Sequence, residues 1–239
     1  MNILVVDVGG THVKVRATNH PSLVEISSGP TMTARKMVSE VKKLAAQIEY
    51  DAVTIGYPGP VLHGKIVAEP HNLGDGWVKF NFARAFDRPA KIVNDAAMQA
   101  LGSYKGKRML FIGLGTGLGS AMIIDGVLAA MELAHLPYKK GRSYEDYVGL
   151  TGLRRLGKKR WRKSVNDVVR QLKNALEVDY VVLGGGNARL LKKIPRWARM
   201  GANVHAFRGG LLVWKKKRPI PVSPQGHIFF QEKIFGAGT

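Results

Sequence analysis

The sequence ILVVDVGGTHVKV, residues 3–15, decides the fold because it combines a strand, a glycine hairpin and a second strand. Glycines such as Gly9 and Gly10 allow positive φ and let backbone N–H groups approach an anion closely. Thr11 adds a hydroxyl donor, and Asp7 is a candidate ligand for Mg²⁺. A plain β-turn would explain the glycine pair on its own, so the phosphate-binding hypothesis needs further support.

Two more glycine turns follow predicted strands later in the chain. One is GLGTGLG, residues 113–119, between two apolar runs, and the other is VVLGGGN, residues 181–187, where a strand meets a predicted helix. Residues 113–119 do not form a dinucleotide fingerprint, because β-branched and apolar residues follow them instead of a helix. Three glycine turns at strand ends predict two phosphate loops and a donor loop that face one cleft.

The predicted catalytic residue lies between the first two glycine turns. Residues 91–93 predict a short strand, Asn94 and Asp95 follow it, and residues 96–101 favour a helix. Open α/β sheets bind ligands at such strand ends. An isolated Asn-Asp pair is more simply explained as a helix N-cap. With a glycine loop on either side in the chain, we expect Asp95 to be catalytic.

The remaining pattern predicts two α/β segments, residues 1–106 and 107–214, followed by a basic, proline-containing tail at 215–239. The predicted strands are 2–8, 13–18, 51–57, 90–93 and 179–183, with two more around Leu110 and Met122, and the predicted helices are 33–48, 95–104 and 163–176. The last helix carries an apolar stripe formed by Val165, Val168, Val169, Leu172 and Leu176. We expect this stripe to pack against a sheet and not to form a dimer face.

Six motifs in this order resemble the ROK family (repressors, uncharacterised reading frames and sugar kinases), within which the chain is most similar to the polyphosphate glucokinase branch. The motifs are DVGGT at 7–11, GYPG at 56–59, VND at 93–95, GLGTGLG at 113–119, ELAH at 132–135 and LGGG at 183–186. Lys14 resembles a lysine beside the first phosphate loop of that branch, and residues 144–149 also resemble the branch. The similarity extends from about Met1 to Trp214.

The resemblance implies an α/β fold of the two-lobed actin-like ATPase (ribonuclease H-like) type, with the active site in the interlobe cleft. It implies transfer of a phosphoryl group from polyphosphate, ATP or both to glucose or a similar hexose, with Asp95 as general base and Mg²⁺ held by Asp7. The implied hexose ligands are Asn72, Asn94, Glu132, His135 and Glu145. The implied phosphate and donor ligands are Asp7, Gly9, Gly10, Thr11, Lys14, Gly115, Thr116, Gly117, Gly184, Gly185, Gly186 and Asn187.

Two features depart from the family pattern. Family members usually carry a cysteine-rich zinc loop after the residue that matches His135, whereas this chain has LPYKKGR at 136–142 and contains no cysteine. A thiolate zinc site is therefore impossible, and we expect no zinc. His135 is expected to bind the sugar, with an ordinary core histidine as the alternative. The tail at 215–239 does not resemble the closing helix of the family.

The charge of the chain is the last informative feature. The 239 residues carry a net charge of +20, and the basic residues gather at 139–142, 154–163 and 192–196. These groups are either solvated faces or contacts for a polyanion such as polyphosphate or a nucleic acid. We do not expect a nucleic-acid partner. Among the family's regulators a helix-turn-helix precedes the first phosphate strand, and nothing precedes it here.

A sugar-responsive regulator and a non-catalytic sugar- or polyanion-binding protein remain as alternatives to the kinase. No apolar run is long enough to span a membrane, and Met1 leads directly into a strand, so we expect a cytoplasmic protein without a signal peptide. A homodimer is compatible with the family.

Overall fold

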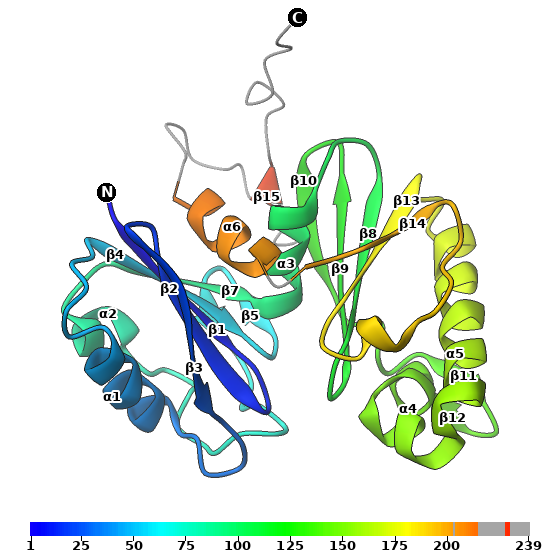
Figure 1. Cartoon of the computed structure of the whole chain (residues 1–239), viewed down its shortest axis with the longest axis horizontal. Helices are drawn as coiled ribbons and strands as arrows, with labels where there is room; N and C mark the ends of the chain where they lie inside the picture. Colours follow the sequence, from blue (N-terminus) through cyan, green and yellow to red (C-terminus); the bar gives the residue numbers. More distant parts are fainter. Residues whose placement is uncertain (203, 215–227, 230–239) are drawn as a thin grey trace, which may run out of the picture. The chain divides into compact units, whose positions relative to one another are not determined.

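The computed structural model describes residues 1–202, 204–214 and 228–229 (Figure 1). By its internal contacts the chain forms two compact units. The first comprises Met1–Met98 and the later residues 206–214, and the second comprises Gln99–His205 and residues 228–229. The predicted tail at 215–239 lies outside the described residues except for Ile228–Phe229. In the described part, no helix is long and apolar enough to cross a bilayer.

The first unit is built on a five-stranded mixed sheet. Its order is β3 (His20–Ser27), β2 (His12–Ala17), β1 (Ile3–Val8), β4 (Ala52–Tyr57) and β7 (Ala90–Asn94). β1, β4 and β7 are parallel, whereas β1, β2 and β3 form an antiparallel meander. Four of these strands confirm the sequence prediction. The fifth, β3, was not predicted, since its sequence HPSLVEIS begins with histidine and proline and lacks a long apolar run.

Helices cover both faces of this sheet. α1 (Ala34–Leu44) and α2 (Phe82–Phe86) pack with alternate strand residues in one core, which also includes the β5–β6 hairpin (Val61–Leu62 and Lys65–Ile66). α1 is capped by the Thr33 side chain, which accepts a hydrogen bond from the backbone of Lys36. On the other face, α6 (Val204–Leu212) approaches the sheet closely: a Cβ at Gly210 would lie 2.5 Å from the Val5 side chain.

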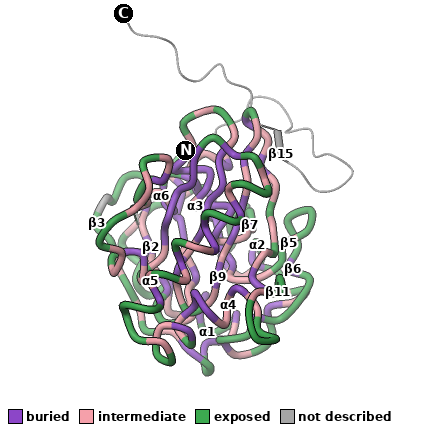
Figure 2. The backbone as a smooth tube through the Cα atoms, turned by 90° about the vertical axis from the view of Figure 1, so that its right-hand side faces the viewer, coloured by how far each residue is buried: buried purple, intermediate pink, exposed green. Residues whose placement is uncertain are grey.

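The second unit is built on a six-stranded mixed sheet. Its order is β14 (Ala198–Met200), β13 (Tyr180–Gly184), β8 (Met109–Leu114), β9 (Leu118–Ile124), β10 (Val127–Met131) and β15 (Ile228–Phe229). The other elements of this unit are the β11–β12 hairpin (Pro137–Lys139 and Arg142–Ser143), α4 (Tyr144–Val148) and α5 (Leu150–Ala175). Between the units in sequence lies α3 (Asp95–Ser103), whose residues up to Met98 belong to the first unit. Buried residues concentrate in the strands, and exposed residues in the loops (Figure 2).

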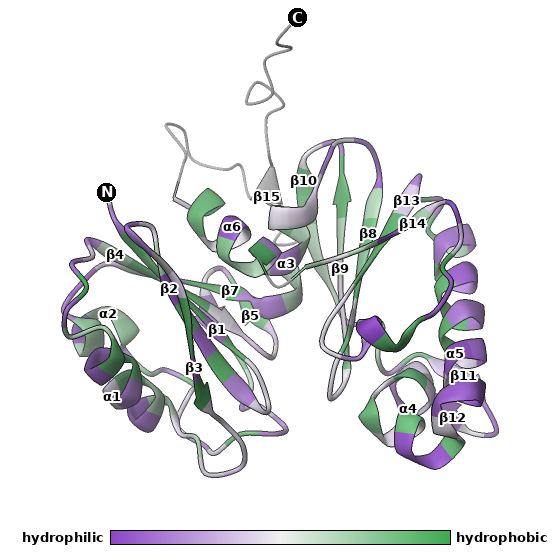
Figure 3. Ribbon diagram, viewed as in Figure 1, coloured by the Kyte–Doolittle hydropathy of each residue, from purple (hydrophilic) through white to green (hydrophobic). Residues whose placement is uncertain are grey.

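Helix α5 confirms the predicted apolar stripe and extends beyond the predicted start. Val165, Val168, Val169 and Leu172 are buried in a core with strands β8 and β13, and Leu176 packs beside them. Much of the rest of the helix surface is hydrophilic (Figure 3). The helix starts at Leu150 instead of residue 163, and Gly157 interrupts it with a φ of 70°. The sequence did not predict this first part of the helix, because residues 154–163 are mostly basic.

One helix prediction is wrong. We expected a helix after the glycines at 184–186, but the chain forms only a 3₁₀ turn, Ala188–Leu190. Asn187 anchors the start of this turn to the preceding loop, since its backbone N–H donates to the Leu114 oxygen at 2.9 Å. Pro195 follows shortly after and disfavours a longer helix.

The attachment of α6 to the first sheet depends on Thr54, which is fully buried on β4. Its hydroxyl donates to the Gly210 oxygen at 2.8 Å and accepts from the indole N–H of Trp214 at 2.7 Å. The carbonyl groups in the last turn of a helix have no intrahelical donor, so Thr54 supplies one here. A single hydroxyl therefore satisfies two groups that the fold removes from water.

Thr54→Val keeps the shape of the side chain but leaves both of these groups without their partner. We expect the free energy of unfolding to fall by about 2–4 kcal/mol, because an unsatisfied buried group costs about 1–3 kcal/mol and the Trp214 indole is only partly buried. Thr54→Ser retains the hydroxyl and should cost about 1 kcal/mol for the lost methyl group. Urea unfolding of both variants measures the difference; equal losses would show that the hydroxyl is not what holds α6.

Candidate active site

The first glycine hairpin is a tight turn between β1 and β2. Val8 pairs with Val13, and the Gly9 N–H donates to the His12 oxygen at 2.9 Å. A Cβ at Gly9 would lie 2.9 Å from that same oxygen. Neither Gly9 nor Gly10 uses the positive φ that glycine allows. Glycine is needed at position 9 because a side chain there would be too close to the His12 carbonyl oxygen across the turn. Thr11 is exposed at its tip.

Asp7, Lys14 and Glu25 form a row of alternating charge across β1, β2 and β3. Asp7 is the register partner of Lys14, and Lys14 is the partner of Glu25. The Lys14 ammonium lies 3.8 Å from a carboxylate oxygen of Glu25. Glu25 was not predicted, since its role follows from the register of a strand that the sequence did not reveal. Lys14 thus lies between two acids, at the base of the hairpin.

The carboxyl group of Asp7 is held in a desolvated position. Burial raises its pKa from the ordinary 3.8 to about 6, and the charge of Lys14 opposes this rise. On its other side Asp7 pairs with Gly56, where a Cβ would lie 3.4 Å from the Asp7 oxygen and 2.3 Å from the Met98 side chain. Because Gly56 of the GYPG motif has no side chain, the side chains of Asp7 and of Met98 on α3 can occupy the space beside it.

Asn94 and Asp95 lie at the end of β7 and the start of α3, as predicted. The Asn94 oxygen accepts from the Ala97 N–H at 3.0 Å, so Asn94 caps α3. Its amide nitrogen donates to the Gly59 oxygen at 3.0 Å, which ties the GYPG turn to the helix start. The N-cap alternative thus holds for Asn94. Asp95 is half-buried, and its carboxylate accepts from the Ala96 N–H at 2.7 Å.

In the first unit these residues meet at one edge of the sheet. Asp7 on β1, Gly56 on β4 and Val93 on β7 form one row, because β1 pairs with β4 and β4 pairs with β7 in parallel. Parallel strands lie about 4.8 Å apart, so the backbones of Asp7 and Val93 are about 10 Å apart. Asp95 follows Val93 by two residues, and the strand ends therefore bring Asp7 and Asp95 into one neighbourhood.

Asn72 lies in a separate loop of the first unit. The loop is fixed by Trp77, whose fully buried indole donates to the Gly74 oxygen at 2.7 Å. The carboxylate of Glu69 accepts the backbone N–H groups of Trp77 and Val78, each at 3.0 Å. Asn72 itself is exposed.

In the second unit the two predicted glycine loops lie against each other. Gly185 has a φ of 81°, and a Cβ there would lie 2.4 Å from the backbone of Leu114. The Asn187 side chain donates to the Gly115 oxygen at 2.8 Å. These contacts place the segment Gly184, Gly185, Gly186 and Asn187 beside the loop that contains Gly115, Thr116 and Gly117. The sequence predicted both loops but not their direct contact.

Glu145 contacts and supports the second glycine loop, residues 113–119. Its carboxylate accepts the Leu118 N–H at 2.8 Å, and a Cβ at Gly117 would lie 2.3 Å from the same oxygen. The backbone N–H of Glu145 donates to the Ala134 oxygen at 3.0 Å. Glu145 therefore joins the glycine loop to the segment of Glu132 and His135. This role was not predicted.

Glu132 and His135 are both exposed, and the His135 ring nitrogen lies 3.8 Å from the Glu132 carboxylate. The alternative of a buried core histidine is therefore wrong, since the His135 side chain is 65% exposed. Within the described residues, no three His, Asp or Glu side chains gather as a metal-binding group. Side chains of this kind at a surface are available to a polar ligand.

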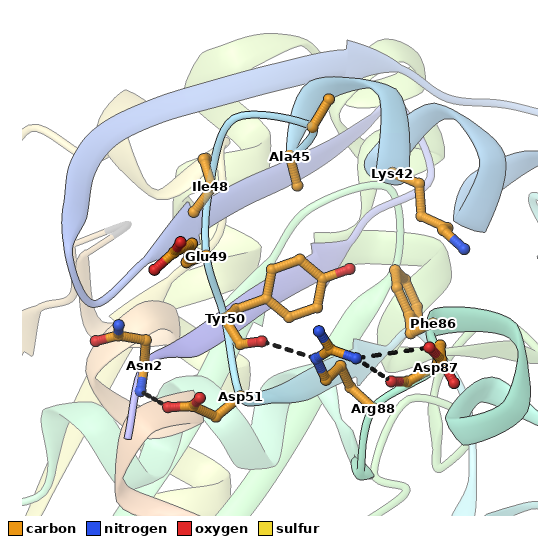
Figure 4. Close-up of a pocket in the computed structure, with 11 residues that line it drawn as sticks. Asn2, Lys42, Ala45, Ile48, Glu49, Tyr50, Asp51, Phe86, Asp87 and Arg88 are labelled. Atoms are coloured by element: carbon orange, nitrogen blue, oxygen red, sulfur yellow. Dashed lines mark hydrogen bonds and ion pairs between the residues drawn. The ribbon is translucent and has the colours of Figure 1, made fainter.

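A hollow of about 590 Å³ lies elsewhere in the first unit (Figure 4). Asn2, Asp51 and Arg88 line it, and these residues precede β1, β4 and β7. Arg88 donates to the Tyr50 and Asp87 carbonyl oxygens at 3.1 and 2.7 Å. The hollow is therefore at the opposite strand ends from Asp7 and Asp95, and none of the predicted site residues lines it.

The raised pKa of Asp7 makes a prediction for stability. Ionised Asp7 destabilises the folded state at any pH above about 6, and the penalty disappears as the pH falls below 3.8. Asp7→Asn should therefore increase the free energy of unfolding by about 2–3 kcal/mol at pH 8 and by almost nothing at pH 4. Urea unfolding in a chelating buffer measures both values, with the exposed Asp75→Asn as control. A gain of equal size at both pH values would contradict the assignment.

Comparisons with known proteins show which proteins the chain is similar to. The chain is 28% identical to the glucokinase of Pyrobaculum calidifontis over 142 residues, which are 54% of this chain and 48% of that protein. It is 30% identical to the polyphosphate glucokinase of Mycobacterium leprae over 158 residues, which are 60% of this chain and 47% of that protein. The chain thus spans about half the length of the curated relatives that it matches.

A solved structure shows the fold. The inorganic polyphosphate/ATP-glucomannokinase of Arthrobacter sp. strain KM superposes with a TM-score of 0.76 at 20% identity, covering 89% of this chain and 97% of that one. The fold is that of the actin-like ATPases, as expected. The family model for ROK matches residues 3–131, more than half of the 239 residues. The chain therefore belongs to the ROK family.

Proposed function

We propose that this protein is a hexose kinase that transfers a terminal phosphoryl group from ATP, polyphosphate or both to a sugar such as glucose. The observation that carries the proposal is the position of Asp95. This carboxylate lies where β7 ends and α3 begins, in the same unit and at the same strand ends as the glycine hairpin and Asp7. A general base beside a phosphate-binding hairpin is what phosphoryl transfer to an alcohol requires.

In the proposed reaction Asp95 accepts the proton of the sugar hydroxyl that attacks the terminal phosphorus. Polar side chains would hold the other hydroxyls, since each hydroxyl both donates and accepts hydrogen bonds. The proposed hexose ligands are Asn72, Asn94, Glu132, His135 and Glu145. Asn94 retains one amide hydrogen beyond its contact with Gly59, and Glu145 retains one carboxylate oxygen beyond its contact with Leu118.

The phosphates of the donor would lie against the glycine loops. The proposed contacts are Gly9, Gly10, Thr11 and Lys14 in the first unit, and Gly115, Thr116, Gly117, Gly184, Gly185, Gly186 and Asn187 in the second. Asp7 fits a Mg²⁺ ligand, because this ion usually takes one or two carboxylates and completes its shell with phosphates and water. A bound Mg²⁺ would neutralise charge on the transferred phosphoryl group. A cation would also offset the desolvation that raises the pKa of Asp7.

The surface of α5 favours polyphosphate as a donor. Five of its cations, Arg154, Lys158, Lys159, Arg160 and Lys163, are exposed. The only acid of the helix, Asp167, is paired with Lys139 and Arg170, and none of the five forms an ion pair with another described residue. Unpaired cations along one helix attract a polyanion much more strongly than they attract a nucleotide, which carries few charges.

Replacing the proposed base tests the reaction. Asp95→Asn keeps the shape but removes the proton acceptor, so phosphoryl transfer should fall by about 10²–10⁴-fold while hexose binding is retained. Steady-state kinetics with glucose, Mg²⁺ and each donor measures the rate, and hexose binding is measured by calorimetry. Asp87→Asn, at the opposite strand ends, is the matched control and should keep the parental rate. A turnover of Asp95→Asn near that of the parent would eliminate Asp95 as the base.

A salt series tests the donor. If α5 binds polyphosphate, the apparent affinity for long polyphosphate should fall steeply with added salt, and that for ATP only slightly. Replacing Lys158, Lys159 and Arg160 together by Ala should reduce the polyphosphate salt slope by roughly two to three, about one for each lost cation. The control replaces Arg35, Lys36 and Lys43 of α1 by Ala and should leave both slopes unchanged.

Equal slopes for the two donors, or phosphorylation with ATP alone at every salt concentration, would assign the basic surface another role. The ATP-dependent kinase would then be the function that the site supports.

A further inference from the structure

The β11–β12 hairpin is held on α5 by a compact polar cluster. Asp167 of α5 accepts a hydrogen bond from the Tyr138 hydroxyl and pairs with the Lys139 ammonium at 2.7 Å. The same ammonium donates to the Tyr138 oxygen at 2.8 Å and lies 4.4 Å from the centre of the Tyr138 ring. One carboxylate thus binds two consecutive residues of the hairpin. We call Tyr138, Lys139 and Asp167 the clasp.

The clasp is supported by aromatic packing beneath it. The Tyr138 ring lies 5.3 Å from the Tyr144 ring and meets the Tyr147 ring edge-on at 4.9 Å. Tyr144 and Tyr147 are buried in the core of the second unit, and the Tyr144 hydroxyl bonds to Gln171 of α5 at 3.2 Å. The hairpin is therefore fixed to α5 by polar contacts and to the Tyr144 and Tyr147 rings of α4 by aromatic packing.

The hydrogen bonds within the clasp favour the charged forms of Asp167 and Lys139. The hydrogen bonds from Lys139 and Tyr138 hold the pKa of Asp167 far below its usual range. The contact with Asp167 in turn raises the pKa of Lys139. The Asp167 side chain is 26% exposed, and it accepts hydrogen bonds from Tyr138, Lys139 and Arg170. Charge-assisted hydrogen bonds of this kind are stronger than neutral ones.

The hairpin is continuous with the proposed hexose ligands of the second unit. The residues just before it contact those just after it: the Tyr144 N–H donates to the Leu136 oxygen, and the Glu145 N–H donates to the Ala134 oxygen, each at 3.0 Å. His135 lies between Ala134 and Leu136, so its backbone is enclosed by these two bonds. A shift of the hairpin relative to α5 would move His135 and Glu145 together.

We infer that Asp167 is a positioning residue for hexose binding, acting through Tyr138 and Lys139 on His135 and Glu145. This inference rests on the proposed function for its substrate, but not for its structural part. The sequence at 136–142 has no cysteine, and the contacts that hold this hairpin on α5 come from Tyr138, Lys139 and Asp167. Positioning within a fraction of an ångström is what a binding residue needs from its support.

Kinetics with Asp167→Ala tests the positioning role. The KM for glucose should rise about tenfold or more, while kcat and the KM for the donor change less than about threefold, since the reacting groups are retained. Asp167→Asn keeps an acceptor for Tyr138 and should give a smaller rise. Lys139→Met should resemble Asp167→Asn, whereas Lys139→Arg keeps the charge and should restore most of the affinity. Arg170→Gln is the matched control: it removes the outer partner of Asp167, at 3.4 Å, and should change nothing.

Hydrogen exchange provides a readout that does not need catalysis. In Asp167→Ala the amides of Tyr144 and Glu145 should exchange at least about tenfold faster, while peptides from β1 and β2 keep the parental rate. Unchanged exchange would show that Asp167 does not hold the hairpin in place. Faster exchange with an unchanged glucose KM would overturn the positioning role. A parent protein that phosphorylates no hexose with either donor would contradict the proposed function and the role of the clasp in hexose binding. The exchange result would still show whether Asp167 holds the hairpin in place.

Discussion

The structure of the first unit depends on the pairing of β1 with β2 on one side and with β4 on the other. This pairing aligns Glu25, Lys14, Asp7 and Gly56 in one row, so that an acid that would avoid a sheet interior is held there by its register. The penalty is visible in the raised pKa of Asp7. A residue that costs stability in its resting state and lies beside a glycine hairpin is characteristic of a ligand site.

Close backbone contact has the same organising role in the second unit. Gly185 packs on the backbone of Leu114, and Gly117 leaves room for the carboxylate of Glu145. Larger side chains at these positions would separate the two loops from each other and from α4. The loops therefore form one assembly, in which Glu145 connects the glycines to the segment of His135. The phosphate-binding and sugar-binding residues proposed for this unit are thus mechanically linked.

The sequence predicted the parts of the fold that have strong periodicity and left out those that depend on tertiary contacts. The apolar runs of β1, β4 and β13 and the stripe of α5 were identified because burial on one or both sides dictates their composition. Strand β3 was missed because its pattern makes sense only beside β2. At the site, the motifs located Asp95 and the glycine loops. The capping role of Asn94 was one of the alternatives, because it depends on Ala97 only three residues away. The contact of Asn94 with Gly59 and the support by Glu145 could not be predicted, since both depend on neighbours distant in sequence.

The chemistry of the clasp also determines which conditions the hairpin tolerates. Residues 136–143 contain no cysteine, histidine or methionine, and they are fixed by a carboxylate, an ammonium group and a phenol. A thiol oxidant therefore has no side chain to modify in this segment. The contacts that hold the hairpin on α5 do not depend directly on the redox state of the surroundings, whereas those of a cysteine-ligated loop do.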